Sequence, residues 1–142
     1  MPVREVIRPP LWLMAFLAFL FLSAVFSVWV ALDSRSTIVT AALSLAALIW
    51  IWLRSPLRIS VDTELRINSA HLEKRFIKSV EVLDANAVRL LRTRDADPAA
   101  FLAIRFWCST GIKVVLDDPR DPTPYWLVSS RNGARLKKAI EA

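Results

Sequence analysis

Apolar side chains dominate the first third of the chain in two uncharged runs, Leu11–Leu32 and Thr37–Leu53. At the helical rise of about 1.5 Å per residue, these runs reach about 33 Å and about 26 Å, which brackets the hydrocarbon core of a bilayer. A helix satisfies its own backbone hydrogen bonds in lipid. The pattern therefore predicts a transmembrane helical hairpin over residues 11–53, with a polar turn at residues 33–36.

A cleaved signal peptide is the alternative explanation for the first run. Arg4 and Arg8 would supply its basic n-region. However, the run is longer than a typical h-region, and no Ala-x-Ala cleavage site closes it. Because the second apolar run would still need an explanation, we favour the hairpin.

Tryptophans and arginines agree on one topology for this hairpin. The tryptophans near the helix ends, where aromatic rings favour the interface, are Trp12, Trp50 and Trp52 on one side and Trp29 on the other. The outer flanks hold four arginines, whereas the turn holds only Arg35, which Asp33 offsets. The positive-inside rule then predicts a multi-pass protein of the inner (plasma) membrane with both termini cytoplasmic, residues 1–10 forming a short N-terminal tail. Neither run holds an ionisable group, which disfavours transport.

Beyond the second run, apolar and polar side chains alternate with the period of two that is typical of half-buried strands. The strands that we expect are 57–61, 64–68, 71–76, 78–83, 101–107, 112–116 and 125–129. Asp84 would cap a brief helix over Ala85–Leu91, and Ser130 would cap an amphipathic helix that closes the chain. Asp117–Pro124 is a proline-rich turn. Residues 54–142 are therefore predicted to form a small cytoplasmic α+β domain.

Most of the positive charge lies in this domain. From Arg54 onward, 16 lysines and arginines face 11 aspartates and glutamates, which gives +5 of the total +6. A tethered basic domain is attracted to anionic headgroups by about 1 kcal/mol per basic residue near the surface. Nucleic acid is disfavoured because the charges alternate in sign instead of clustering. The basic residues that we expect to contact anionic lipid are Arg54, Arg58, Arg66, Lys74, Arg75 and Lys78.

Residues with metal-binding or nucleophilic chemistry are few. His71 is the only histidine and Cys108 the only cysteine, so no His–His metal pair and no internal disulfide can form. Asp117, Asp118 and Asp121 suggest a calcium loop, but prolines restrict this segment and the EF-hand spacing is absent. The sequence therefore predicts no catalytic residue, no metal site, no cofactor and no enzymatic activity.

Tyr125 and Trp126 are the candidate residues for contact with a protein partner. In a strand with a period of two, one ring would face the core and the other would face outward. The outward ring would rest on the closing helix or the bilayer interface, or would contact a partner.

Four segments resemble an actinobacterial family of short two-helix membrane proteins of unknown function. These are Asp84-Ala-x-Ala-x-x-x-Leu91, Asp97-Pro98, Arg105-x-Trp107 and Asp118-Pro-x-Asp-Pro-Thr-Pro-Tyr-Trp-Leu-Val-Ser-Ser-Arg131. The similarity covers nearly the whole chain. The order of elements after the hairpin also resembles bacterial pleckstrin-homology-like domains, which implies an antiparallel sheet or partly open barrel closed by a C-terminal helix. The resemblance implies a membrane location and brings no catalytic residues.

Three hypotheses follow for the function. We favour a membrane-anchored adaptor whose small cytoplasmic domain binds a partner protein or anionic lipid without catalysis. The alternative is an accessory or assembly subunit of a larger membrane complex, with the hairpin as the interface. The third hypothesis is a metal-dependent enzyme that uses the Asp-Pro-rich loop.

Overall fold

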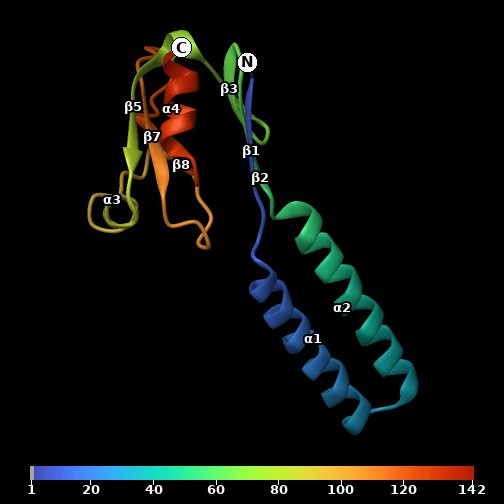
Figure 1. Cartoon of the computed structure of the whole chain (residues 1–142). Helices are drawn as coiled ribbons and strands as arrows, with labels where there is room; N and C mark the ends of the chain where they lie inside the picture. Colours follow the sequence, from blue (N-terminus) through green and yellow to red (C-terminus); the bar gives the residue numbers. More distant parts are fainter. Residues whose placement is uncertain (1) are drawn as a thin grey trace. The chain divides into compact units, whose positions relative to one another are not determined.

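The computed structural model describes residues 2–142, which divide into two compact units. The hairpin unit comprises Arg8–Pro56. The globular unit comprises the residues up to Ile7 together with Leu57–Ala142. Figure 1 shows that the first unit holds two long helices and that the second holds the strands and two short helices.

The hairpin unit consists of α1 (Leu11–Ala31) and α2 (Ser34–Arg54), which pack against each other. Both helices are long and apolar enough to cross a membrane. No residue of either helix is buried, unlike the core helix of a soluble protein. The helix α2 begins three residues earlier than the apolar run, because Asp33 caps it and accepts a hydrogen bond of 3.3 Å from the amide of Ser36.

The first sheet of the globular unit is antiparallel and has the strand order β1-β2-β3-β4. Its strands are β1 (Val3–Ile7), β2 (Leu57–Val61), β3 (Glu64–Ile67) and β4 (Ala70–Glu73). The sequence predicts a tail over residues 1–10, whereas Val3–Ile7 form the edge strand of this sheet. The strand forms because Val3, Glu5 and Ile7 alternate with exposed residues and face the interior.

The hairpin is therefore inserted between two neighbouring strands of one sheet. Ile7 lies opposite Leu57 in the antiparallel register, while residues 8–56 lie between them in sequence. Because β1 and β2 are neighbours, the chain enters α1 and leaves α2 on the same side of any bilayer that both helices cross. A cleavage after α1, as in a signal peptide, would separate β1 from its sheet.

The second sheet has the order β5-β7-β8-β6. Its strands are β5 (Ile77–Leu83), β6 (Phe101–Ala103), β7 (Gly111–Leu116) and β8 (Tyr125–Ser129). The strand β6 pairs in parallel with β8, and the other two pairings are antiparallel. The expected strand over 101–107 ends at Ala103, because the chain then turns and the amide of Cys108 bonds to the carbonyl of Arg105 at 2.9 Å.

Helices and a turn complete the globular unit. The short helix α3 (Ala85–Arg92) follows β5, with its cap at Asp84 as the sequence predicts. A 3₁₀ turn, η1 (Lys74–Phe76), replaces the end of the expected strand 71–76. The closing helix α4 (Gly133–Glu141) begins after Asn132, later than expected, and the Ser130 oxygen accepts its hydrogen bond from the amide of Asn132, before the helix.

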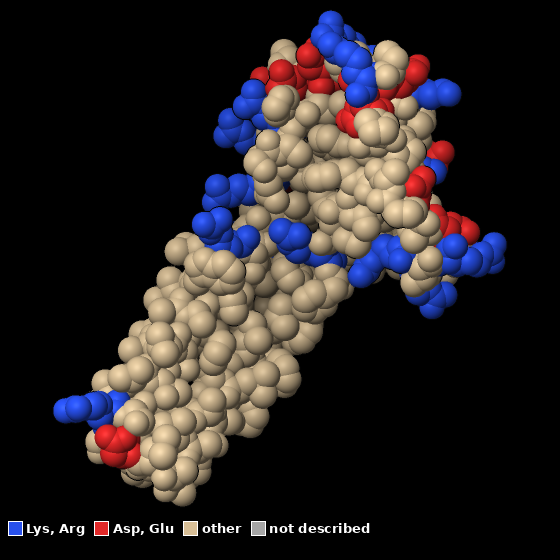
Figure 2. All heavy atoms as spheres, turned by 180° about the vertical axis from the view of Figure 1, so that it is seen from behind, with Lys and Arg blue, Asp and Glu red and all other residues tan. Residues whose placement is uncertain are grey.

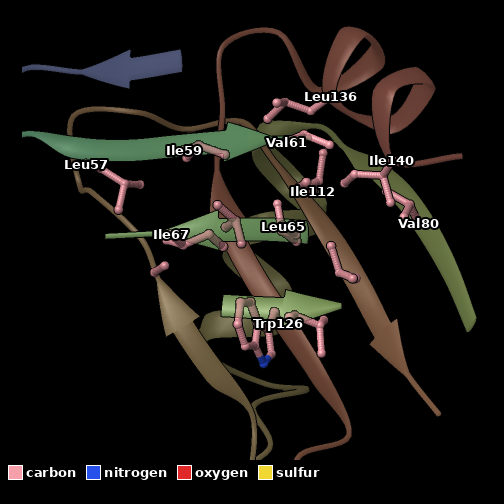
Figure 3. Packing of buried hydrophobic residues seen from close by; sticks show 14 of the residues in the cluster. Leu57, Ile59, Val61, Leu65, Ile67, Val80, Ile112, Trp126, Leu136 and Ile140 are labelled. Atoms are coloured by element: carbon pink, nitrogen blue, oxygen red, sulfur yellow. The ribbon is translucent and has the colours of Figure 1, made fainter. Parts of the chain in front are cut away.

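The main core lies between the two sheets and α4 (Figure 3). The first sheet contributes fully buried residues such as Ile59 and Leu65, and the second contributes Ile112. Leu136 and Ile140 of α4 pack into the same cluster. The fold class is thus two long apolar helices with a β-rich region of two sheets and a C-terminal helix. Neither sheet closes into a barrel among the described residues, and the pleckstrin-homology-like likeness stays a prediction.

A second cluster covers the other face of the second sheet. It joins Val88 of α3 to Leu83, Tyr125 and Leu127. All five residues of β8 are consequently buried, because the sheet is covered on both faces.

Glu5 fastens β1 to the far end of the chain. Its Oε2 accepts a hydrogen bond of 2.7 Å from the hydroxyl of Ser130, and its Oε1 accepts one of 2.8 Å from the amide of Arg131. The Ser130 oxygen also accepts a bond of 3.1 Å from the amide of Asn132, at the start of α4. One carboxylate thus holds the edge strand against the segment that leads into the closing helix.

Replacement of Glu5 should loosen this junction. We expect Glu5→Ala to lower the free energy of unfolding of the globular unit by about 1–3 kcal/mol, because two hydrogen bonds to a charged group are lost. Chemical denaturation of the full-length protein in detergent measures this change. The control is Glu64→Ala, which removes only an exposed ion pair with Arg66 and should cost less than about 1 kcal/mol. Equal losses in the two variants would contradict the role of Glu5.

Candidate functional site

The outer face of the first sheet gathers basic and polar side chains in one row. The register places Arg4 opposite Ser60, Ser60 opposite Arg66, and Arg66 opposite His71, so one residue comes from each strand. All of them point away from the core, since their strand neighbours are the buried residues. Arg58 lies opposite Val6, two residues before Ser60 on β2, and so points outward as well. We call the surface formed by these residues the cationic face: Arg4, Arg58, Ser60, Arg66 and His71.

The charge changes sign along this face. Two residues beyond the Arg4–His71 row, about 7 Å farther along the strands, Glu64 lies opposite Glu73. Asp62 lies in the adjoining turn. The arginines therefore lie nearer to the Ile7–Leu57 pair than the carboxylates do: Arg58 is one row away from the pair, and Arg4 and Arg66 are three rows away, ahead of the acidic row.

Most of the basic side chains of the cationic face have no partner within residues 2–142. Arg66 is the exception, since its guanidinium lies 3.3 Å from Glu64 Oε2. The face is also hollowed: three open depressions of about 290, 350 and 260 Å³ share Arg66 in their linings. Arg4 and Ser60 line two of them. Figure 2 shows how strongly charge gathers on the globular unit, whereas the helices are uncharged between their ends.

The chain holds this end of the sheet close to the hairpin. Three residues separate Ile7 from α1, and two separate α2 from Leu57. An extended chain covers about 3.5 Å per residue, so these strand ends lie within about 14 Å and about 11 Å of the helix ends, whatever the orientation of the units. Arg8 lies on the first connection, and Arg54 is the last residue of α2, directly before the second connection.

The structure separates the six basic residues that the sequence grouped together. Arg58 and Arg66 belong to the cationic face, and Arg54 ends α2. The strand β4 runs from the row of Ile67 to that of Glu64, so the chain leaves the sheet at its acidic end. The remaining three residues follow from there: Lys74 and Arg75 in η1, and Lys78 in β5.

Two of these three already have partners in the fold. The Lys74 ammonium donates a bond of 2.8 Å to the carbonyl of Ala139 near the end of α4, which the negative end of the helix dipole favours. Arg75 lies 2.7 Å from Glu73. Arg4, by contrast, was missed by the sequence analysis. The alternation of Val3–Ile7 was the available signal for it.

The candidate partner residues Tyr125 and Trp126 are both buried. Their exposed fractions are 7% and 6%, so the expectation that one ring faces outward is wrong. Trp126 lies in the main core, where its ring centroid is 4.7 Å from that of Phe101. Tyr125 lies in the second cluster beneath α3, with the Lys113 ammonium 4.8 Å from its ring centroid.

Comparison with known proteins assigns the family. The family model described as "Protein of unknown function (DUF3093)" matches residues 3–140. The chain belongs to this family. The match runs from β1 through the inserted hairpin to α4, so it covers both units. No curated protein and no solved structure matches the chain.

The aspartates of the DUF3093 chain's proline-rich turn bond locally. Asp118 accepts a bond of 2.9 Å from the amide of Arg120, and Asp121 accepts one of 2.9 Å from the amide of Thr123. Hydrogen bonds from the side chain and the amide of Thr123 lower the pKa of Asp121 below its usual value. No group of three potential metal ligands occurs within the described range 2–142.

The other polar candidates lie apart from one another. Cys108 is buried, and its thiol lies 3.6 Å from the carbonyl of Thr110. His71 is exposed on the cationic face, two strands away from Ser60. At about 4.8 Å per strand, their backbones are about 10 Å apart, which is too far for a hydroxyl and an imidazole paired as nucleophile and base.

The buried hydroxyl of Tyr125 allows a test of the position that the structure gives to this side chain in the DUF3093 protein. It has no hydrogen-bond partner among residues 2–142. Removal of a buried, unpaired polar group should not destabilise the fold, so Tyr125→Phe should keep or raise the free energy of unfolding, by up to about 1 kcal/mol.

Chemical denaturation of the full-length variant measures this change. Tyr125→Ala is the control, and it should cost about 3 kcal/mol or more because it empties part of the second cluster. A clear loss of stability in Tyr125→Phe would show that the hydroxyl is bonded.

Proposed function

We propose that this DUF3093 protein is a membrane-anchored, non-catalytic binding protein whose globular unit binds anionic lipid at the bilayer surface. The observation that carries the proposal is the position of the arginines. The unpaired ones, Arg4 and Arg58, lie nearer than the carboxylates to the strand ends that two short connections join to the hairpin.

The proposed topology places both ends of the hairpin on the cytoplasmic side of the inner (plasma) membrane. Arginines flank the helices at these ends, whereas the Asp33–Arg35 turn carries no net charge. The positive-inside rule favours this orientation. The cytoplasmic leaflet is the one whose anionic lipids attract basic segments, by about 1 kcal/mol per lysine or arginine near the surface.

Lipid is favoured over a protein partner because of the aromatic residues. A partner that docks on an outward ring of Tyr125 or Trp126 would need one of these rings to be exposed, and both rings are buried. The cationic face is instead hydrophilic and open, as a surface for charged headgroups should be. The separation of Ser60 from His71 supports binding without catalysis.

Hydrogen exchange of the full-length protein in bilayer discs tests the proposal. Amides of residues 54–60 and 64–71 should exchange more slowly in discs that contain phosphatidylglycerol than in discs of phosphatidylcholine alone, because anionic lipid holds the globular unit against the surface. High salt should remove the difference, since the Debye length falls to about 3 Å at 1 M. The loop 93–99 serves as an internal control. Equal exchange of residues 54–71 in both discs would refute lipid binding.

A second candidate uses the hairpin itself as the interface with a larger membrane complex. Its support is a groove of about 770 Å³ on the hairpin, lined by Phe19, Phe26 and Trp29 among other residues. The hydroxyls of Ser23 and Ser27 in this groove bond to carbonyls of their own helix, so they permit close helix approach. This candidate would be favoured if hydrogen exchange were equal in the two kinds of disc and a membrane protein co-purified with the chain.

A further inference from the structure

We propose that the cationic face is a defined binding site for the phosphate group of an anionic lipid, held between Arg4 and Arg66 over Ser60. This inference rests on the proposed function and goes beyond it. The proposed function needs only positive charge near the bilayer, whereas a site needs particular residues in a particular arrangement.

The register supplies the arrangement. Arg4 and Arg66 flank Ser60 directly on the two neighbouring strands, so their backbones lie about 10 Å apart with the hydroxyl midway. An arginine side chain is long enough to bring its guanidinium above the central strand from either side. The planar fork of a guanidinium matches two oxygens of a phosphate, and a serine hydroxyl donates to a third. Arg4, Ser60 and Arg66 line one depression together with Arg58, and Asp62 and Glu64 do not line it.

Unbalanced charge favours an anion there. The side chains of Arg4 and Arg58 have no hydrogen bond or ion pair among residues 2–142, and Glu64 is the acid that pairs with Arg66. Three arginines on one small surface repel one another, and a phosphate between them would relieve that repulsion. Arg58 lies in the next outward row, beside Val6 on β1, where it would meet a second oxygen or a neighbouring headgroup.

Two features indicate that the phosphate belongs to a lipid. The arginines lie nearer to the linkers than the acidic row of Glu64 and Glu73 does. An anionic surface would attract the arginines and repel the acidic row. Val6, whose exposed fraction is 50%, adds an apolar side chain beside Arg58 and between Arg4 and the linker, as suits contact with the acyl boundary.

Titration of the full-length protein in neutral detergent with short-chain lipids tests the site. The probes are dioctanoyl phosphatidic acid, dioctanoyl phosphatidylglycerol, dioctanoyl phosphatidylcholine and inorganic phosphate, with binding followed by calorimetry. The test variant carries Arg4→Gln, Arg58→Gln and Arg66→Gln. The matched control carries Arg89→Gln, Arg92→Gln and Arg94→Gln, which removes the same charge from α3 and the loop after it.

The site predicts that both anionic lipids bind the wild type more tightly than phosphatidylcholine does. The dissociation constant should rise about tenfold or more in the test variant, since charge-assisted hydrogen bonds are lost, and about twofold or less in the control. Unchanged chemical denaturation would show that the test variant is folded. If it is not folded, Arg4→Gln alone should still weaken binding more than Arg89→Gln.

The remaining outcomes overturn the site in distinguishable ways. Equal weakening in the two variants would mean that net charge alone attracts lipid, which removes the site but leaves the proposed function standing. If inorganic phosphate bound as tightly as the lipids, the site would not select a lipid, and the proposal that its phosphate belongs to a lipid would be overturned. Absence of binding by any anionic lipid would overturn the site, and the bilayer-disc exchange would decide the proposed function separately.

Discussion

The pairing of β1 with β2 joins the two ends of the hairpin in a single sheet. A strand of five residues at the start of the chain completes a sheet whose other strands follow 49 residues later, from Leu57 onward. Edge strands are held weakly by the ladder alone, and here Glu5 adds two bonds to the segment before α4. As a result, the globular unit includes the segments of the sequence before and after the hairpin. A fragment that begins at Arg54 lacks its edge strand, so full-length protein is the appropriate material for experiments.

The same pairing determines which charges lie near the strand ends that are joined to the hairpin. Because Ile7 lies opposite Leu57, the outward residues next in line are Arg58 and then Arg4, and the antiparallel partners bring Arg66 and His71 into the same row. Distance along the sequence is a poor guide to this layout. Lys74 follows Arg66 by only eight residues, yet it lies beyond the acidic row and bonds to α4.

Much of the fold could be predicted from local patterns. The hydropathy of the two apolar runs predicts α1 and α2, the alternation after Leu57 predicts most strands, and Asp84 marks the start of α3. These features depend on nearby residues. The strand β1 was missed because a five-residue run before Pro9 and Pro10 is indistinguishable from a tail until its partner is known.

The errors at the candidate site have the same origin. An alternating strand normally exposes one face, which is why one ring of the Tyr125–Trp126 pair was expected outside. In the structure α3 covers that face, and a period of two contains no information about a covering helix from another part of the chain. The row of Arg4, Ser60 and Arg66 likewise depends on pairing between strands, because its members come from three separate segments.

Cross-linking of β1 to β2 tests most directly whether the hairpin is inserted between these two strands. Val6→Cys with Arg58→Cys places two thiols on directly opposite residues of neighbouring strands, which is within disulfide reach. In the full-length protein under mild oxidation, these thiols should form one intramolecular bond, while Val6→Cys with Arg66→Cys, one strand farther away, should not. Failure of the first pair to cross-link, or equal cross-linking of both pairs, would contradict the insertion of the hairpin into the sheet.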